Sequence, residues 1–329
     1  MNNTNYFRRL LNWKNVTTVV LLVMLYFGVG ILINTKLLSE YYQVNLFMIG
    51  INIILATSLN LINGFTGQFS IGHAGFMAVG AYVSAIWTVK LHYSFPVAIL
   101  LGALATGLVG FLIGLPTLRL RGDYLAIATL GLGEIIKVVL LNIEYVGGAT
   151  GIIGIPRLTT WTWLFILTVG TVLIIKNFVN STYGRACISV RENEVAAEAM
   201  GINTTKYKVL AFTIGAFFAG VAGALFAHYF YLVQPMTFSF LKSFDVLVIV
   251  VLGGLGSLTG SVVAAVLLTV MSAALQNFPD IRMVLYALVL IFVMLYRPQG
   301  LLGTKEMTFN LFRKVRGDHG GPSRHQETV

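Results

Sequence analysis

Two stretches of this chain run longer than one membrane crossing without a charged residue, and they constrain its fold more than any other feature. Residues 41–89 and residues 246–279 contain no Asp, Glu, Lys or Arg. Because about 20 apolar residues suffice for a helix to cross a bilayer, we read two crossings in each stretch. The whole chain is 57% hydrophobic and 10% charged, against about 25% charged residues in soluble domains. The sequence therefore predicts an all-α, polytopic integral membrane helical bundle.

Glycine-rich turns divide both stretches. The first turn is 63–72, Asn-Gly-Phe-Thr-Gly-Gln-Phe-Ser-Ile-Gly, and the second is 253–257, Gly-Gly-Leu-Gly-Ser. Helices broken at corresponding places in two halves are where many transporters place their pathway. We predict about ten spans, with eight spans plus re-entrant segments as the alternative. The predicted spans are about 16–33, two within 41–89, 95–115, 123–141, 160–178, 209–233, two within 246–279, and 281–296.

Basic residues collect in the segments that we place on the cytoplasmic side, as the positive-inside rule requires. These segments are the N-terminus (1–15), the turn at 117–122, the loop at 180–207 and the tail (304–329). Both termini are then cytoplasmic, around a transmembrane domain at 16–303, and the small, polar tail is expected to be disordered. The net charge of +10 has this topological explanation, because no basic patch with interleaved aromatic residues indicates nucleic-acid binding.

The segment 181–208 is a polar island between two apolar spans. Good helix formers fill its middle, and Gly201 is well placed to end a helix. One interpretation is a solvated helix between two spans, and the other is a helix that lies along the membrane surface and docks onto a soluble partner. The residues that we assign to such a contact are Arg185, Arg191, Glu192, Glu194, Ala196, Ala197, Glu198 and Gly201.

One face of the second span is polar. Asn45, Asn52, Asn60 and Asn63 fall within an arc of about 60° on a helix. They either hydrogen-bond between helices or line a pathway. The glycine-rich segment that follows has irregular backbone, which a membrane tolerates only where it is buried in protein or lines a cavity. The candidate pathway residues are Asn52, Asn60, Asn63, Gly64, Gly67, Gln68, Ser70, Gly72, His73, Glu134, Gly253, Gly254, Gly256 and Ser257.

Other titratable residues indicate no catalysis. Glu134 and Lys137 lie three residues apart inside the fifth predicted span, a spacing that allows either a structural ion pair or a pathway role. Ser70 and His73 lack a nearby acidic residue that would orient the histidine. We expect no catalytic residue, no metal site and no enzyme activity.

The single cysteine, Cys187, excludes an intrachain disulfide. It falls in the polar island, so we expect an impermeant maleimide to label it from the cytoplasmic side. The sequence contains no G-x-x-x-x-G-K-[ST] motif, and the chain therefore has no P-loop of its own. If ATP drives transport, the ATPase is another polypeptide.

A series of motifs then carries a resemblance. They are Gly67-Gln-Phe-Ser-Ile-Gly-His-Ala-Gly-Phe, Arg121-Gly-Asp-Tyr-Leu-Ala-Ile-Ala-Thr-Leu-Gly, Gly133-Glu-Ile-Ile-Lys, Gly148-Ala-Thr-Gly, the polar island, Val251-Leu-Gly-Gly-Leu-Gly-Ser and Arg297-Pro-Gln-Gly-Leu. In this order and spacing they resemble the LivM family, the inner-membrane permeases of branched-chain amino acid importers of the ATP-binding-cassette (ABC) class. The island is similar to the ABC coupling motif E-A-A-x-x-x-G. Ala196, Ala197 and Gly201 match that motif, Val195 stands where the Glu would be, and Glu194 is one position early.

The resemblance implies a multi-pass permease of a bacterial inner membrane that moves leucine, isoleucine and valine into the cytoplasm, with no cofactor bound by this chain. It implies a heterodimer with a LivH-like permease, two LivG/LivF-like ATPases that bind ATP and Mg, and a LivJ/LivK-like binding protein outside that does most of the substrate selection. A permease for urea or short amides is the alternative, because its subunits look similar. An ion-coupled secondary transporter is disfavoured, because both glycine-rich turns lack Asp and Glu.

Overall fold

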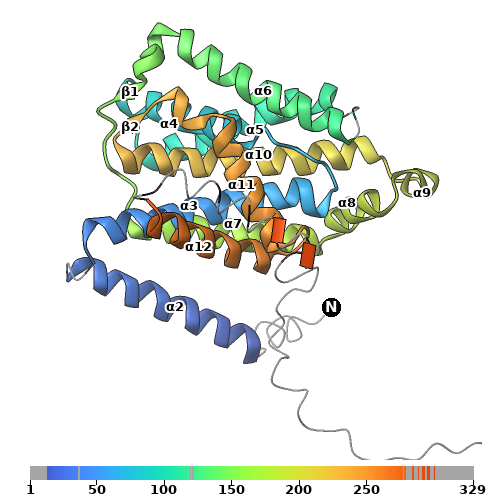
Figure 1. Ribbon diagram of the computed structural model, residues 1–329, viewed down its shortest axis with the longest axis horizontal. Coiled ribbons are helices and arrows are strands. Elements are labelled where there is room, and N and C mark those ends of the chain that lie inside the picture. The colour runs from blue at the N-terminus through green and yellow to red at the C-terminus, as the bar shows by residue number, and fades with distance from the viewer. Residues whose placement is uncertain are drawn as a thin grey trace, which may run out of the picture.

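The computed structural model is a bundle of helices with one short strand pair (Figure 1). It describes residues 13–35, 38–118, 120, 122–276, 278, 284, 288, 291–292, 295–296 and 300. Six helical segments are long and apolar enough to cross a membrane, and they are Glu40–Phe65, Phe95–Thr117, Asp123–Asn142, Trp161–Asn180, Thr204–Phe230 and Pro235–Gly253. Shorter apolar helices are Val20–Asn34, His73–Val89 and Leu258–Ala274. The chain is thus a polytopic helical membrane protein.

The helix bounds follow the apolar runs of the sequence. The helices are α2 (Trp13–Asn34), α3 (Glu40–Asn60) with a π-helical end, η1 (Leu61–Phe65), α4 (His73–Val89), α5 (Phe95–Thr117), α6 (Asp123–Asn142), α7 (Trp161–Asn180), α8 (Thr182–Glu192), α9 (Glu194–Ala199), α10 (Thr204–Phe230), α11 (Phe240–Gly253) and α12 (Leu258–Ala274). Both uncharged stretches divide into two helices at their glycine-rich turns, as predicted. The predicted span at 281–296 lies mostly outside the described residues, and its described positions are helical. The predicted tail, 304–329, lies wholly outside them.

Two predicted helix ends need correction, and one short strand pair is added to the predicted helical bundle. The predicted span 95–115 stops before Pro116, whereas α5 includes Pro116 and ends at Thr117. Helix α10 begins at Thr204 rather than at Val209, because the Asn203 side chain caps it by accepting a hydrogen bond from the Lys206 amide at 3.0 Å. Two short strands were not predicted: β1 (Ile152–Ile153) pairs antiparallel with β2 (Leu232–Val233).

Helices α4, α5 and α10 form the tightly packed centre of the bundle. Their backbones meet at glycines: a Cβ on Gly80 would lie 2.3 Å from the Gly220 carbonyl oxygen, and one on Gly223 would lie 2.0 Å from the Met77 carbonyl oxygen. Small residues permit this approach in lipid, where packing rather than the hydrophobic effect drives helix association. In the most apolar 18-residue stretch of the α10 span, 78% of the residues are buried. Helix α10 is therefore the central helix of the described bundle.

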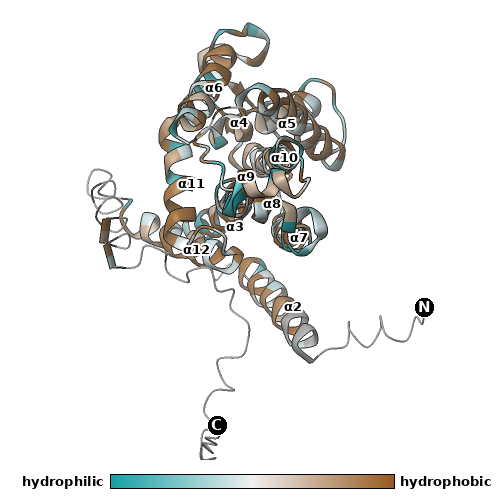
Figure 2. Cartoon of the chain, turned by 90° about the vertical axis from the view of Figure 1, so that its right-hand side faces the viewer, coloured by the Kyte–Doolittle hydropathy of each residue, from teal (hydrophilic) through white to brown (hydrophobic). Residues whose placement is uncertain are grey.

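Helices α2, α6 and α7 lie at the periphery. In the corresponding 18-residue stretches, only 17% of the residues of α6 and 22% of those of α7 are buried. The helices are built mostly of hydrophobic residues (Figure 2), and many large apolar side chains of the bundle are exposed, as expected for helices that face lipid. Helix α2 contacts α7 through Tyr26, whose hydroxyl lies 3.0 Å from the Thr162 hydroxyl and whose carbonyl accepts a hydrogen bond from the Trp161 indole at 3.1 Å.

The two ends of the bundle differ. The strand pair and the glycine-rich connection between α6 and α7 lie at one end, and α8 and α9 project from the opposite end (Figure 1). The polar island of the sequence is therefore a pair of helices outside the apolar bundle.

Candidate functional site

The polar island folds as two capped helices, not as the single helix that we expected. The Ser181 side chain caps α8 by accepting from the Gly184 amide at 3.3 Å, and the Asn193 side chain caps α9 by accepting from the Ala196 amide at 3.0 Å. Asn193 itself has an extended backbone, so it ends α8 and starts α9. The cap separates the island into two helices with different surroundings.

Gly201 ends α9, as predicted. Its φ is +81°, the left-handed conformation that favours glycine. The Gly201 amide donates to the Glu198 carbonyl at 2.9 Å, and the Ile202 amide donates to the Ala197 carbonyl at 3.0 Å. These two bonds form the Schellman motif, and α10 then starts directly beyond it.

The charged residues of α9 find their partners within this chain. Glu194 Oε1 lies 2.6 Å from Lys208 Nζ of α10. Glu198 Oε1 accepts a hydrogen bond from the Thr204 hydroxyl at 2.7 Å. Both carboxylates therefore tie α9 to the first turn of α10.

The outward face of α9 is apolar. Val195 is 69% exposed and Met200 is 82% exposed, and Ala196 and Ala199 are exposed between them. At 100° per residue these four positions share one face of the helix, opposite the buried Ala197. This apolar face is made of alanine, valine and methionine side chains, and the exposed Glu198 lies beside it.

Arg191, the penultimate residue of α8, connects the island to both glycine-rich turns. Its Nη1 donates to the Gly64 carbonyl at 2.9 Å. A Cβ on Gly67 would lie 2.8 Å from Arg191 Cγ, and one on Gly256 would lie 2.8 Å from Arg191 Nη1. The absence of side chains at these glycines lets the guanidinium enter between the turns. The guanidinium also forms an ion pair with Glu192, whose Oε1 lies 2.5 Å from Arg191 Nη2.

The two glycine-rich turns lie side by side, and Asn60 joins them. Its Nδ2 donates to the Ser257 carbonyl at 2.9 Å and the Ser261 hydroxyl at 2.7 Å, and its Oδ1 accepts from the Gly256 amide at 2.9 Å. A Cβ on Gly64 would lie 1.8 Å from Asn60 Oδ1 and 2.3 Å from the Gly256 nitrogen. Of the two roles that we left open for Asn60, the structure shows the interhelical hydrogen bonds. We call these turns with Asn60 and Arg191 the glycine junction.

The segment 66–72 returns alongside the end of α3, with protein groups binding its irregular backbone. The Asn63 side chain donates to the Ser70 carbonyl at 3.1 Å and accepts from the Ser70 amide at 3.2 Å. The Ile71 amide donates to the Thr129 hydroxyl of α6 at 3.1 Å, and the Gln68 side chain donates to the Lys208 carbonyl at 3.1 Å. Such backbone is tolerated at membrane depth when it is buried in protein.

Three predicted pathway residues, Gln68, Ser70 and His73, are buried inside the protein. His73 Nε2 lies 2.9 Å from the Ser58 hydroxyl. Within the described part of the chain, Gln68 Oε1, Ser70 Oγ and His73 Nδ1 have no hydrogen-bond partner. Each such atom costs about 1–3 kcal/mol, so these residues hold unused hydrogen-bonding capacity in a compact segment. Gly72 packs against α6, where a Cβ would lie 2.1 Å from the Thr129 carbonyl oxygen.

Glu134 and Lys137 form an ion pair on α6. Glu134 also binds outside its own helix, because its Oε1 accepts from the Phe240 amide at the start of α11 at 3.0 Å. A carboxylate at a helix N-terminus is stabilising. Of the two roles that we left open for the pair, this geometry favours the structural one, which holds α6 against α11.

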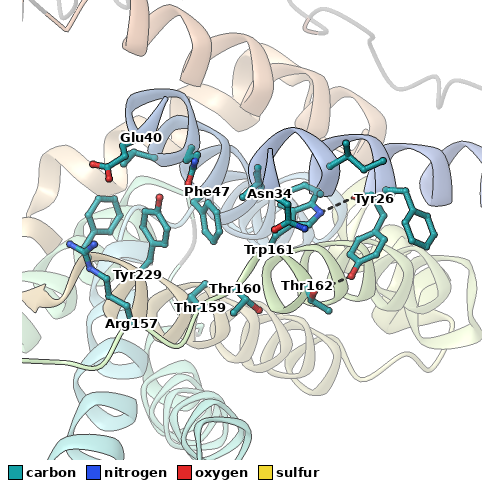
Figure 3. A pocket seen from close by; sticks show the side chains of 17 residues that line it. Tyr26, Asn34, Glu40, Phe47, Arg157, Thr159, Thr160, Trp161, Thr162 and Tyr229 are labelled. Carbon is teal, nitrogen blue, oxygen red and sulfur yellow. Dashed lines mark hydrogen bonds between the residues drawn. The ribbon is translucent and has the colours of Figure 1, made fainter. Parts of the chain in front are cut away.

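A cavity of about 730 Å³ lies near the strand-pair end, beside α2 (Figure 3). Its walls carry the aromatic residues Tyr26, Trp161 and Tyr229, and Glu40 and Arg157 lie near Tyr229. None of the candidate pathway residues lines it. It therefore does not belong to the glycine junction or to the polar face of α3.

Cys187 is not the accessible reporter that we expected. It is fully buried on the inner side of α8, and its Sγ lies 3.7 Å from the Tyr207 carbonyl oxygen. Burial raises the pKa of the thiol to about 11, so little of it is the reactive thiolate at neutral pH. In the described residues no group of three or more His, Cys, Asp and Glu side chains could hold a metal ion.

Sequence reasoning missed several supporting residues. Thr129 and Ser243 are isolated hydroxyls in apolar helices, and each binds the 66–74 backbone, Ser243 by accepting from the Ala74 amide at 3.0 Å. A lone hydroxyl in a span is a usable signal, because polar groups in lipid-embedded helices need partners. The predicted crossing began with the uncharged stretch at 246–279, which excludes Lys242 and Asp245. The span in the structure, Pro235–Gly253, starts earlier and contains both residues.

This arrangement defines a class of protein: a polytopic membrane protein with an external helix pair tied to buried, irregular turns, which suits transport. The chain belongs to the family described as "Branched-chain amino acid transport system / permease component", whose model matches residues 41–294.

Relatives with curated names agree. The chain is 38% identical to the "High-affinity branched-chain amino acid transport system permease protein LivM" of Salmonella typhimurium, over 77% of this chain and 68% of the relative. It is 37% identical to the LivM protein of Escherichia coli over the same shares. The similarity extends to the permease protein LivH of Salmonella typhimurium, at 30% identity over 51% of this chain and 55% of the relative. No solved structure matches the chain significantly.

Proposed function

We propose that this chain is the LivM-type permease subunit of an ABC importer that moves leucine, isoleucine and valine into a bacterial cell. One observation carries the proposal: the family match runs from α3 to residue 294, so it includes the glycine junction and the α8–α9 island. The match therefore covers the elements that a permease needs for passage and for coupling.

In this proposal the chain forms a heterodimer with a LivH-like permease. The similarity of this chain to both LivM and LivH proteins supports it, because two homologous subunits readily form a pseudo-symmetric pair. Two LivG/LivF-like ATPases bind ATP and Mg at the cytoplasmic face, and a LivJ/LivK-like binding protein delivers the amino acid from outside. The positive-inside rule supports about ten spans in the inner membrane, with both termini and the α8–α9 island in the cytoplasm.

The island is the coupling element of the proposal. Of the eight residues that the sequence assigned to the contact with the ATPase, Arg191, Glu194 and Glu198 have side chains that bind within the chain. The outward face of α9, with Val195 and Met200, supports an apolar contact instead. Movement of α9 by the ATPase then reaches the glycine junction through α8 and Arg191, as a shift of a packed element.

Reconstitution of the whole complex tests the proposed function. Proteoliposomes with this chain, the LivH-like permease, both ATPases and the binding protein accumulate radiolabelled leucine when ATP is supplied on the ATPase side. A matched complex without this chain gives the background. Uptake of urea or acetamide in place of leucine contradicts the proposed substrate. Leucine accumulation that follows an ion gradient and ignores ATP contradicts the proposed class of transporter.

A further inference from the structure

The cavity of about 730 Å³ beside α2 is charged at one end. Glu40 of α3 and Arg157, from the connection before α7, lie there near Tyr229 of α10, and Tyr26 of α2 lies toward the other end (Figure 3). The volume is within the range of about 300–1,000 Å³ for ligand sites. Helix α2 lines the cavity mostly with apolar positions, which are Phe27, Gly30, Ile31 and Ile33. The lining therefore suits a ligand with a charged part and an apolar part.

The two charged side chains are available to a ligand. Both are exposed. In the part of the chain that the structure describes, neither the Glu40 carboxylate nor the Arg157 guanidinium has a hydrogen bond or an ion pair. A guanidinium matches the oxygens of a phosphate or a carboxylate bidentately, and a carboxylate accepts hydrogen bonds from an ammonium group. The charged end of the cavity therefore fits a zwitterion.

Aromatic side chains hold the walls of the cavity in place. The Tyr229 ring stacks on the Phe47 ring, with the two centroids 4.1 Å apart. The Trp161 indole donates to the Tyr26 carbonyl at 3.1 Å and so ties α2 to the start of α7. Tyrosine and tryptophan collect at the depth of the lipid headgroups in membrane proteins. The charges beside these rings are therefore within reach of headgroups.

The position of the cavity favours a lipid over a transported amino acid as the zwitterion. The cavity lies beside the peripheral helix α2, on which the lining residues Phe27 and Ile31 are 61% and 59% exposed. The family match starts at residue 41, so α2 and Glu40 lie before it. The cavity is therefore built in part outside the region shared with the permease family, next to a helix that faces lipid.

We propose that this cavity binds one phospholipid whose headgroup carries a primary ammonium, as that of phosphatidylethanolamine does. Arg157 binds the lipid phosphate, Glu40 binds the ammonium group, and Phe27 and Ile31 contact an acyl chain. The lipid fills the space between α2 and the rest of the bundle at the strand-pair end, and it holds α2 there. The site does not depend on which solute the protein transports.

The test uses the complete complex in nanodiscs of phosphatidylcholine, with a small fraction of phosphatidylethanolamine that carries a photoactivatable group in its acyl chain. Mass spectrometry maps the crosslinked peptides, and unlabelled lipids compete for the site. The proposal predicts crosslinks at the cavity that phosphatidylethanolamine displaces about threefold better than phosphatidylglycerol, because only the former offers an ammonium group to Glu40. Crosslinks that both lipids displace equally, or none at the cavity, overturn the proposal.

Two charge variants separate the contacts with the headgroup. Arg157→Gln lowers the crosslink yield at the cavity by about tenfold, as expected for the loss of a hydrogen bond to a charged group. Glu40→Gln lowers it less and removes the preference for phosphatidylethanolamine. Glu144→Gln is the matched control and changes neither, because Glu144 is exposed in the connection between α6 and α7 and does not line the cavity. An unchanged yield from Arg157→Gln in an assembled complex overturns the site.

A neutral variant tests the apolar part of the cavity and leaves both charges in place. Gly30 lines the cavity, and its Cβ position meets only the Trp161 ring, at 3.8 Å. Gly30→Leu therefore fills space that an acyl chain needs, and we expect the crosslink yield to fall by about threefold or more. Gly28→Leu is the control on the same helix, because Gly28 does not line the cavity and nothing lies within 4 Å of its Cβ position. Equal yields from the two variants contradict a lipid in the cavity.

Saturating leucine distinguishes a lipid site from a substrate site. Leucine also carries a carboxylate and an ammonium group, so as the occupant it competes for Arg157 and Glu40. The lipid site predicts a crosslink yield that leucine does not change, and a yield that falls with leucine overturns it. The crosslink is measured without ATP, so a complex that binds the lipid and takes up no leucine refutes the proposed function and leaves the lipid site intact.

Discussion

The glycine junction and the outward face of α9 meet in the island, where Arg191 of the junction precedes α9 by a few residues, and they have opposite surroundings. In the junction, Asn60 makes hydrogen bonds to four different groups and Arg191 binds the Gly64 carbonyl. On α9, Val195 and Met200 are largely exposed. The polar groups are used to fix the island to the bundle, and the apolar groups are left outside. A helix pair with one attached half and one open half is suited to pass force from a partner into the membrane domain.

The largest effect is expected from adding a methyl group to the junction. Gly64→Ala places a Cβ within 1.8 Å of Asn60 Oδ1 and 2.3 Å of the Gly256 nitrogen, so α3 and the second turn must separate. Overpacking a close contact costs about 1–3 kcal/mol or more, and we expect about 3 kcal/mol here. Unfolding in mixed micelles measures it. Gly170→Ala is the control, because its Cβ meets nothing within 4 Å. Equal stabilities for the two variants contradict the tight junction.

Arg191→Met tests whether the attached half transmits movement. It removes a charged hydrogen bond of about 1.5–3 kcal/mol between α8 and the Gly64 carbonyl, while the α9 face stays intact. We expect the complex to assemble and hydrolyse ATP, with substrate-stimulated hydrolysis and uptake reduced by about tenfold. Arg185→Met is the matched control, because Arg185 is exposed and, among the described residues, its side chain hydrogen-bonds to Thr182 at 3.5 Å. Normal uptake by the Arg191 variant would show that the glycine junction takes no part in coupling.

Gly201→Val tests the turn that aims the chain from α9 into α10. Nothing lies within 4 Å of its Cβ position, so the cost is conformational and comes from the φ of +81°. A β-branched residue in this region costs about 1–2 kcal/mol, measured as a lower unfolding midpoint. Gly201→Asn, which tolerates the left-handed conformation better, loses less. A valine variant as stable as wild type rules out this backbone geometry.

The smallest effect is expected from the ion pair between α9 and α10. Glu194→Gln leaves Lys208 without its partner at 2.6 Å, and both side chains are less than a third exposed. We expect a loss of about 1 kcal/mol, between the values for surface and buried pairs. The swap Glu194→Lys with Lys208→Glu restores part of it. Glu192→Gln is the exposed control and should change stability by less than about 0.5 kcal/mol. Equal losses from both single variants contradict the inward orientation of Glu194.

Apolar runs and glycines made most of the fold predictable. Uncharged stretches of sufficient length located the helices, and Gly201 ended α9 where its position after good helix formers indicated. The charged side chains were harder, because their partners lie elsewhere in the chain. Nothing in the spacing of Arg191 and Gly64 reveals their hydrogen bond, and the composition of the island favoured an outer charged face over the apolar one. The break at Asn193 was readable in principle, since asparagine before Glu194 is a helix-start signal.

The central claim is that the apolar face of α9, and not its charges, contacts the ATPase. A photo-crosslinking amino acid placed at Val195 or Met200 tests it in the assembled complex, with Tyr183 of α8, also exposed, as the position on the attached half of the island. We predict crosslinks to an ATPase subunit from positions 195 and 200 and none from position 183. Crosslinks from position 183 alone, or none from positions 195 and 200 in a complex that transports leucine, contradict the account.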